Sequence, residues 1–304
     1  MNPGGILDEL APTVVSLYER HLSMAKEWFP HQMVQWSRGQ DYDPEWTWSA
    51  GDFQTTKAVR SALFLNLLTE DNLPFYTLAL HRTFSADGGI WGEWSRRWTS
   101  EEDRHSTVIR DWIHINRVID PVALERARMK QIGVGYYPDY ATNALEGLVY
   151  VSLQELATRI AHHNTGKHIE DPAGKAILTR VAADENLHFL FYRDLATVAL
   201  ELDPNAMMPA MARMVKTFEM PGTGIPGFEK HSYNVALAKI FDYTQFHDQV
   251  LVPVVLRHWK IESLTGLDDG AERARDEILA HMALVAEMGE RFSKIRPVVA
   301  PQYV

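Results

Sequence analysis

Two short motifs in the sequence combine a carboxylate and an imidazole at a spacing that suits metal binding. They are Glu102-x-x-His105 and Glu185-x-x-His188. Residues three apart lie on one face of a helix, so each motif can direct both side chains at one ion. Frequency alone would not separate two such motifs from incidental surface pairs, so their context has to decide.

Two further carboxylates stand in apolar surroundings. Glu70 follows the apolar stretch 63–68, and Glu155 follows Leu148 and Val151 on the same helical face. An isolated buried charge is very costly, so such a carboxylate must be neutral, paired or bound to a metal. One buried glutamate is usually a satisfied structural residue, whereas two beside these motifs favour a metal site.

The spacing of these residues repeats along the chain. Glu70 precedes Glu102 by 32 residues, and Glu155 precedes Glu185 by 30. Each interval suits two antiparallel helices that meet at mid-height, because about 15 residues of helix cover about 22 Å. The order is Glu and then Glu-x-x-His, written twice, as in di-iron and di-manganese carboxylate bundles. The expected metal ligands are Glu70, Glu102, His105, Glu155, Glu185 and His188, and oxygen and imidazole ligands suit either iron or manganese.

An acidic residue also precedes each motif, Glu101 in one case and Asp184 in the other. Metal-bound histidine usually donates its other N–H to a carboxylate, and these two acids are suited to accept it. The alternative is that both are solvated acids near helix starts.

Composition restricts the function classes further. The chain contains no cysteine, which excludes disulfides, thiolate metal sites, iron–sulfur clusters and cysteine nucleophiles. A formal net charge of −10 argues against a protein that binds nucleic acid. No apolar run approaches the roughly 20 residues of a transmembrane segment, and the N-terminus lacks a signal-peptide pattern. We therefore expect a soluble, cytoplasmic protein.

The elements that must position the ligands are helices. Gly, Pro and Asp clusters separate long stretches in which apolar residues are three and four apart, which favours an all-α fold. Asp120–Pro121 and Asp171–Pro172 are typical of an N-cap followed by proline at the first helical position. No shift in composition marks a second domain, so 1–304 is expected to be a single domain. The predicted helices are 7–29, 52–84, 90–118, 121–132, 138–168, 171–201, 204–218, 228–261 and 271–293.

At these residues the chain resembles the soluble acyl-acyl-carrier-protein desaturases, the family of plastid stearoyl desaturases and their actinobacterial relatives. The likeness spans most of the chain and implies a ferritin-like helical bundle, with a di-iron carboxylate centre in a four-helix core plus additional helices. The similar segments are Thr69–Pro74, Trp91–His105, Gln154–Thr158 with His163–Thr165, Ala183–His188 and Trp259–Leu267.

The resemblance implies two iron ions per chain, cycling between Fe2+ and Fe3+, with O2 as co-substrate. It also implies a homodimer that receives two electrons from a ferredoxin-type donor. The expected reaction introduces a cis double bond into an acyl chain carried on acyl carrier protein. No amino-acid side chain attacks an unactivated C–H bond, so a redox metal is required for it.

The resemblance also implies roles for residues near the ligands. Thr158 would face the oxygen pocket one helical turn past Glu155, although its hydroxyl could instead bond to its own helix. Asp184 would link His105 to Trp36 and form an electron route. For Trp36, a place in the core is an equally good interpretation.

Gly147 and Leu148 would line the acyl tunnel, or they would simply pack in the core. Asn186 and Leu187 depart from the resemblance, because plant enzymes carry basic residues there. Acyl carrier protein is acidic, so this loss of positive charge leaves the docking surface open.

Two alternative functions use the same ligands. A di-iron monooxygenase would hydroxylate or N-oxygenate a carrier-bound or free substrate, and would leave an added oxygen in the product. An iron-storage bundle would take up iron without oxidising an organic substrate. The length of the chain disfavours the second alternative.

Overall fold

The computed structural model describes residues 3–86 and 88–296, and these residues form helices joined by loops, with no strand among them. The all-α prediction is therefore confirmed. The longer helices are α1 (Pro3–Met24), α3 (Lys57–Glu70), α4 (Leu73–Phe84), α5 (Gly89–Ile115), α6 (Pro121–Val134), α7 (Ala144–Lys167), α8 (Pro172–Leu202), α9 (Pro204–Lys216), α10 (Phe228–Leu237) and α12 (Asp269–Ile295). The shorter elements are α2 (Pro30–Met33), α11 (Tyr243–Gln245), the π-helix η4 (Phe246–His258) and the 3-10 turns η1 (Trp36–Arg38), η2 (Ala50–Asp52), η3 (Asp139–Thr142) and η5 (Ile261–Ser263).

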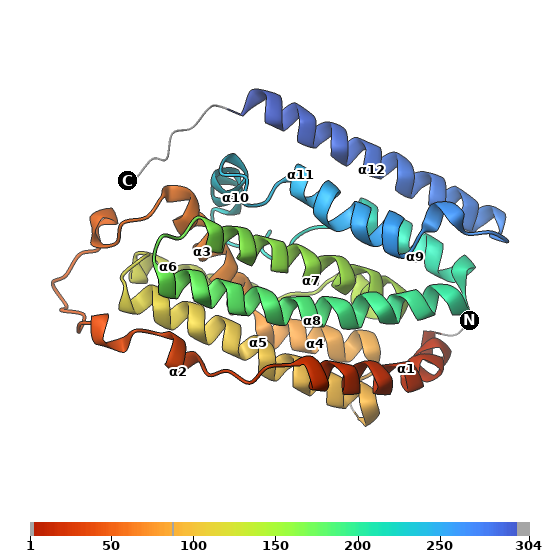
Figure 1. Cartoon of the computed structure of the whole chain (residues 1–304), viewed down its shortest axis with the longest axis horizontal. Helices are drawn as coiled ribbons and strands as arrows, with labels where there is room; N and C mark the ends of the chain where they lie inside the picture. Colours follow the sequence, from red (N-terminus) through yellow and green to blue (C-terminus); the bar gives the residue numbers. More distant parts are fainter. Residues whose placement is uncertain (1–2, 87, 297–304) are drawn as a thin grey trace.

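A core of four helices, α3, α5, α7 and α8, carries the candidate ligands. The helices α7 and α8 pack against each other along their length, and α5 packs on α8 and α3 (Figure 1). On one side α1 packs against α5 and α8, whereas on the other side α9 packs against α7 and α12 packs against α9. This arrangement is a ferritin-like helical bundle with additional helices, as predicted.

The predicted helix starts at two Asp-Pro pairs are confirmed. The Asp171 carboxylate accepts the backbone N–H of Gly174 at 2.9 Å, and Pro172 begins α8. The Asp120 carboxylate accepts the N–H of Val122 at 2.9 Å at the start of α6. These caps pair backbone donors that the first turn of a helix leaves free.

The predicted helix 52–84 is wrong as a single element. The observed helix α3 starts at Lys57, where the Thr56 side chain accepts the N–H of Val59, and it ends at Glu70. Pro74 explains the break, because its ring would collide with the carbonyl four residues earlier, and a second helix begins at Leu73. The ligand candidate Glu70 therefore lies in the last turn of α3.

Two other predicted helices are shorter than expected. The prediction 7–29 overran α1, because Phe29 precedes Pro30 and adopts an extended conformation. The prediction 228–261 divides where Lys239 takes a positive φ of 59°, and the chain then continues through α11 into the π-helix.

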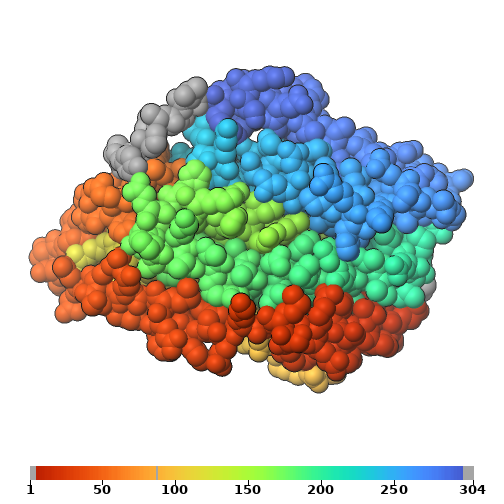
Figure 2. All heavy atoms as spheres, viewed as in Figure 1, coloured from red at the N-terminus to blue at the C-terminus, as the bar shows by residue number. Residues whose placement is uncertain are grey.

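The N-terminal segment runs along one long edge of the molecule, and α12 runs along the opposite edge (Figure 2). The helices between these edges bury most of the apolar side chains. None of the helices within residues 3–86 and 88–296 has the length and apolar character needed to cross a membrane.

Candidate metal centre

The six predicted ligands come together inside the four-helix core, and all are buried. They form two groups whose potential ligand atoms lie within 4.8 Å of one another. Glu102 and Glu185 belong to both groups, so each can bridge two ions. The first group is completed by Glu70 and His105, and the second by Glu155 and His188.

Both histidines turn the same ring nitrogen toward the carboxylates. The Nδ1 atom of His105 lies 3.1 Å from Glu102 Oε2 and 3.2 Å from Glu185 Oε1. The Nδ1 atom of His188 lies 2.8 Å from Glu102 Oε1. The two Nε2 atoms point away from the carboxylate cluster, so the residues surround two adjacent positions with oxygen and nitrogen donors.

Several of these inward atoms are buried and make no hydrogen bond of good geometry, even where a neighbouring ligand atom lies within reach. They are Glu102 Oε1, Glu155 Oε2, Glu185 Oε1 and His188 Nδ1. A buried acceptor without a partner costs about 1–3 kcal/mol, so four in one place need an explanation. Metal cations would satisfy all four atoms, and the residues present therefore fit a two-metal centre.

The electrostatics of the cluster lead to the same conclusion. Burial raises the pKa of Glu70 to about 7, although its hydrogen bond with His162 opposes the shift. Burial and the charges of Glu185 and Glu102 raise the pKa of Glu155 well above its ordinary value. Glu70 and Glu155 therefore resist ionisation in this cluster, and two divalent cations would remove that penalty.

Each predicted acid lies behind the histidine of the other motif. The Glu101 carboxylate on α5 accepts the Nε2–H of His188 on α8 at 2.9 Å. The Asp184 carboxylate on α8 lies 3.6 Å from Nε2 of His105 on α5. Such partners fix which nitrogen carries the proton and leave Nδ1 free to bind a metal.

The predicted contact between Asp184 and Trp36 is wrong. The Trp36 side chain is 49% exposed, and its indole N–H donates to the His31 carbonyl. Trp28 takes the expected place, because its indole N–H donates to Asp184 Oδ2 at 2.7 Å. The chain is extended after α1 ends, and this conformation turns Trp28 inward.

Thr158 lies beside the candidate ligand Glu70 at the edge of the cluster. Its hydroxyl accepts a hydrogen bond from Gln154 Nε2 at 3.0 Å, so it is also bonded within its own helix. Thr158 and Glu70 line two cavities that lie next to each other. One cavity is bordered by ligand carboxylates and tyrosines, among them Tyr136 and Tyr140. The other is almost wholly apolar.

Neither Gly147 nor Leu148 lines these two cavities. Leu148 is fully buried in the apolar core, and a Cβ added to Gly147 would collide with the Thr83 methyl group. Tyr150 and Val151, one turn further along α7, line the cavity beside the carboxylates instead. The core interpretation of Gly147 and Leu148 fits their contacts here.

Three residues at the site were missed by the sequence reasoning: His21, Trp28 and His162. The Nε2 atom of His162 lies 2.8 Å from Glu70 Oε1. The spacing of Glu155 and His162 is a usable signal, because residues seven apart share a helical face. No local signal marks His21 or Trp28, because they reach the site from a different part of the chain.

The fold and the site define a helical carboxylate bundle with places for two metal ions. A sequence profile described as "Fatty acid desaturase" matches residues 4–302. The chain therefore belongs to the fatty acid desaturase family.

Named relatives agree with this membership. The chain is 38% identical over 285 residues to DesA1 of Mycobacterium tuberculosis, which is named as an acyl-ACP desaturase, and this covers 90% of the chain and 83% of DesA1. It is 29% identical over 243 residues to a chloroplastic stearoyl-ACP 9-desaturase of Arabidopsis thaliana, covering 74% of the chain and 61% of the plant protein. The X-ray structure of DesA2 from Mycobacterium tuberculosis shares the fold, with a TM-score of 0.72 and 24% identity over 89% of this chain and 99% of that one.

Proposed function

We propose that the chain is an O2-dependent di-iron enzyme that introduces a cis double bond into an acyl chain held on acyl carrier protein. One observation carries the proposal: two buried carboxylate–histidine groups share Glu102 and Glu185 and border cavities suited to an alkyl chain. The acyl carrier protein follows from the names of the relatives. The two irons would be held by Glu70, Glu102, His105, Glu155, Glu185 and His188.

A bound and reduced iron pair would, together with O2, supply an oxidant able to attack an unactivated C–H bond. The protein contributes ligand orientation, exclusion of water and a channel for the substrate. The Trp98 indole N–H donates to Glu155 Oε1 at 3.0 Å and fixes that carboxylate. Burial of all six ligands keeps bulk water from the reacting positions.

The cavities support a path for the acyl chain. A surface groove between α9, α10 and α12 shares Met220, Phe228 and Phe241 with the apolar cavity. That cavity reaches Glu70 and Thr158, which also line the cavity beside the carboxylates. An alkyl chain lying along this path would pass the metal positions, with its distal end among the tyrosines.

The remaining parts of the proposal concern electrons and assembly. Trp28, hydrogen-bonded to Asp184 behind His105, replaces Trp36 as the electron route from a ferredoxin-type donor. The family resemblance supports a homodimer and a cytoplasmic location. The family profile over 4–302 supports treating 1–304 as a single desaturase domain.

An anaerobic iron titration tests the proposal, followed by O2 and product analysis with stearoyl-loaded acyl carrier protein and a ferredoxin system. We expect two irons per chain and a monounsaturated product, whose double-bond position gives the regiochemistry. A hydroxylated product would identify the monooxygenase instead. Iron uptake without an altered acyl chain would favour storage, and far less than two irons would contradict the metal centre itself.

A further inference from the structure

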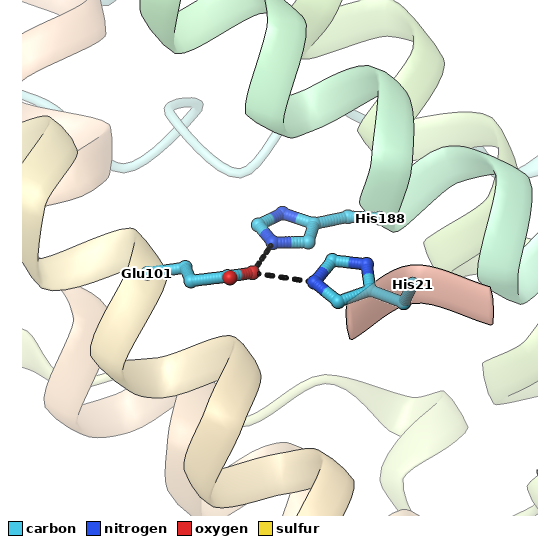
Figure 3. A group of neighbouring side chains, drawn as sticks. All are labelled: His21, Glu101 and His188. Carbon is cyan, nitrogen blue, oxygen red and sulfur yellow. Dashed lines mark hydrogen bonds and ion pairs between the residues drawn. The ribbon is translucent and has the colours of Figure 1, made fainter. Parts of the chain in front are cut away.

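A third buried histidine lies directly behind one of the candidate ligands. His21, in the last turn of α1, is only 4% exposed. Its Nε2 lies 2.9 Å from Glu101 Oε2, and the same oxygen lies 2.9 Å from His188 Nε2 (Figure 3). Figure 3 shows both rings directed at this one carboxylate from separate helices.

The chemistry of these groups fixes the direction of both hydrogen bonds. An ionised carboxylate has no hydrogen to donate, so both Nε2 atoms must carry one. A metal must bind His188 through an unprotonated nitrogen, which is then Nδ1, the atom that faces the ligand carboxylates. Glu101 thereby sets the tautomer of His188, and His21 helps to set the position of Glu101.

The other contacts of His21 hold its ring in place and add no second polar partner. The ring stacks on His188 with centroids 5.7 Å apart and meets Trp94 edge-on at 5.0 Å. Its Nδ1 atom is buried without a hydrogen-bond partner. The other oxygen of Glu101 pairs with Arg97, so the carboxylate is held at both ends.

A corresponding contact exists behind the other histidine. Trp28 donates to Asp184, which lies behind His105, as His21 donates to Glu101 behind His188. His21 and Trp28 are seven residues apart at the end of α1 and just after it. One short N-terminal stretch therefore supplies a hydrogen-bond donor to both acids. The packing of α1 on the bundle places these donors behind the candidate ligands.

We propose that His21 is a positioning residue of the metal centre, which orients Glu101 and through it the metal-binding nitrogen of His188. This inference rests on the proposed metal centre. Its consequence is asymmetric. A change at His21 weakens the binding of the ion held by His188 and Glu155, and leaves the binding of the ion held by His105 and Glu70 unchanged. Altering the partner behind a metal-bound histidine typically costs about 10–100-fold in metal affinity.

A competing interpretation is a third metal ion, because His21, Glu101 and His188 have ligand atoms close enough to hold one. The 2.9 Å contacts to Glu101 are ordinary hydrogen-bond lengths. Metal binding there would also have to remove the proton from Nε2 of a histidine already used by the centre. We therefore favour the hydrogen-bonded arrangement, and metal counting separates the two.

The test uses the full chain loaded with Co2+, whose absorption spectrum reports coordination, and follows metal release to a chelator. Wild type should hold two ions per chain. His21→Asn, whose shorter amide cannot reach Glu101, should release one of them about 10–100-fold faster. His21→Gln can place an N–H near the former Nε2 and should stay close to wild type. Tyr18→Phe, which alters another α1 residue beside Trp94, is the matched control.

The outcomes separate this inference from the proposed function. If wild type binds two ions and His21→Asn releases them at the same rate as wild type, the role of His21 is overturned and the metal centre is not. Three ions per wild-type chain would overturn it in favour of a third metal site. No Co2+ bound by wild type would overturn the metal centre and the role of His21 with it. Circular dichroism of each metal-free variant ensures that only folded proteins are compared.

Discussion

The two sides of the candidate metal centre are built from opposite kinds of residues. On the side that faces α1, Glu101 and Asp184 form ion pairs with Arg97 and Arg180. Arg104 lies between the acids, 3.8 Å from Glu101 and 3.4 Å from Asp184. The Nε2 atoms of His21, His105 and His188 face these two carboxylates. The pKa values of both acids lie below their ordinary range, because the contacts with the histidines outweigh the burial that would raise them.

On the opposite side the same ligands face cavities. Glu70 is hydrogen-bonded to His162, and burial raises its pKa. The apolar cavity beside it is lined mainly by side chains such as Leu65 and Val235. The exposed surface of this cavity is mainly apolar, which suits the proposed approach of an alkyl chain to the ligands.

The difference indicates a division of labour. Charged and hydrogen-bonded groups on the α1 side fix the histidines and link them toward the surface, which suits electron delivery. The cavity side is mainly apolar, which suits the proposed alkyl substrate. Four predictions test this contrast, in order of decreasing expected effect.

The largest effect is expected from removal of a ligand. Two variants test this, Glu155→Ala on the cavity side and His188→Ala, whose ring contacts Glu101 on the charged side. Each should abolish iron binding and turnover, while the helical content stays mostly intact. Iron content, activity and circular dichroism measure this result. Glu201→Ala, at an exposed position on α8, is the control. Full iron and turnover in both ligand variants would contradict the assignment.

The metal-free protein should lose stability as the pH rises. Burial raises the pKa of Glu70 from 4.5 to about 7 against its bond with His162, so the folded chain binds more protons than the unfolded chain between these values. The free energy of unfolding therefore falls as pH rises from about 4.5 to about 7, by about 3 kcal/mol from this group. Urea unfolding of chelator-treated protein measures it.

Glu70→Gln supplies the control for this pH dependence. The variant cannot ionise at this position, so its stability curve should be flatter over the same range. The iron-loaded wild type should also lack most of the slope, because bound metal keeps its ligands deprotonated at neutral pH. A metal-free wild type as stable at pH 7 as at pH 5 would contradict the raised pKa.

Trp28→Phe should slow electron delivery about tenfold, because it removes the donor to Asp184 behind His105. Trp36→Phe is the matched control, since that side chain is half exposed and bonded to a backbone carbonyl. Stopped-flow reduction of the di-ferric protein measures both rates. Equal reduction rates in wild type and Trp28→Phe would contradict an electron route through Trp28 on the charged side.

The smallest effect is expected at Thr158. Thr158→Val removes a hydroxyl that borders both cavities, and loss of one hydrogen-bonding group costs about 1 kcal/mol, or about fivefold in rate. The ratio of product formed to O2 consumed measures whether oxygen is used less efficiently. Thr158→Ser keeps the hydroxyl and should behave like wild type. If both variants match wild type, the hydroxyl serves its own helix only.

Local sequence patterns predict much of the helical fold and of the candidate site. Helix-forming stretches and their Asp-Pro starts were predicted because caps and periodicity act over a few residues. The repeated spacing of Glu70, Glu102, Glu155 and Glu185 also predicted that they meet in one core, although Glu70 lies at the end of the short helix α3 and not at the middle of a long one. The helix break after Glu70 was readable in principle, because Pro74 acts on the carbonyl four residues before it.

Other features depended on contacts between segments that are distant in sequence. Nothing near Trp28 or Trp36 distinguishes the tryptophan that contacts Asp184, because the choice depends on where α1 ends and how the extended chain returns. His21 meets Glu101 across 80 residues for the same reason.

The sequence by itself therefore predicted the candidate metal ligands, their order and the helical bundle that carries them, because periodicity and spacing are properties of the chain. Only the tertiary structure decided which residues stand behind those ligands: Trp28, His21 and His162. It also decided which side of the centre is charged and which is open. These choices depend on how helices pack and how the segments between them turn, and no short stretch of sequence encodes that.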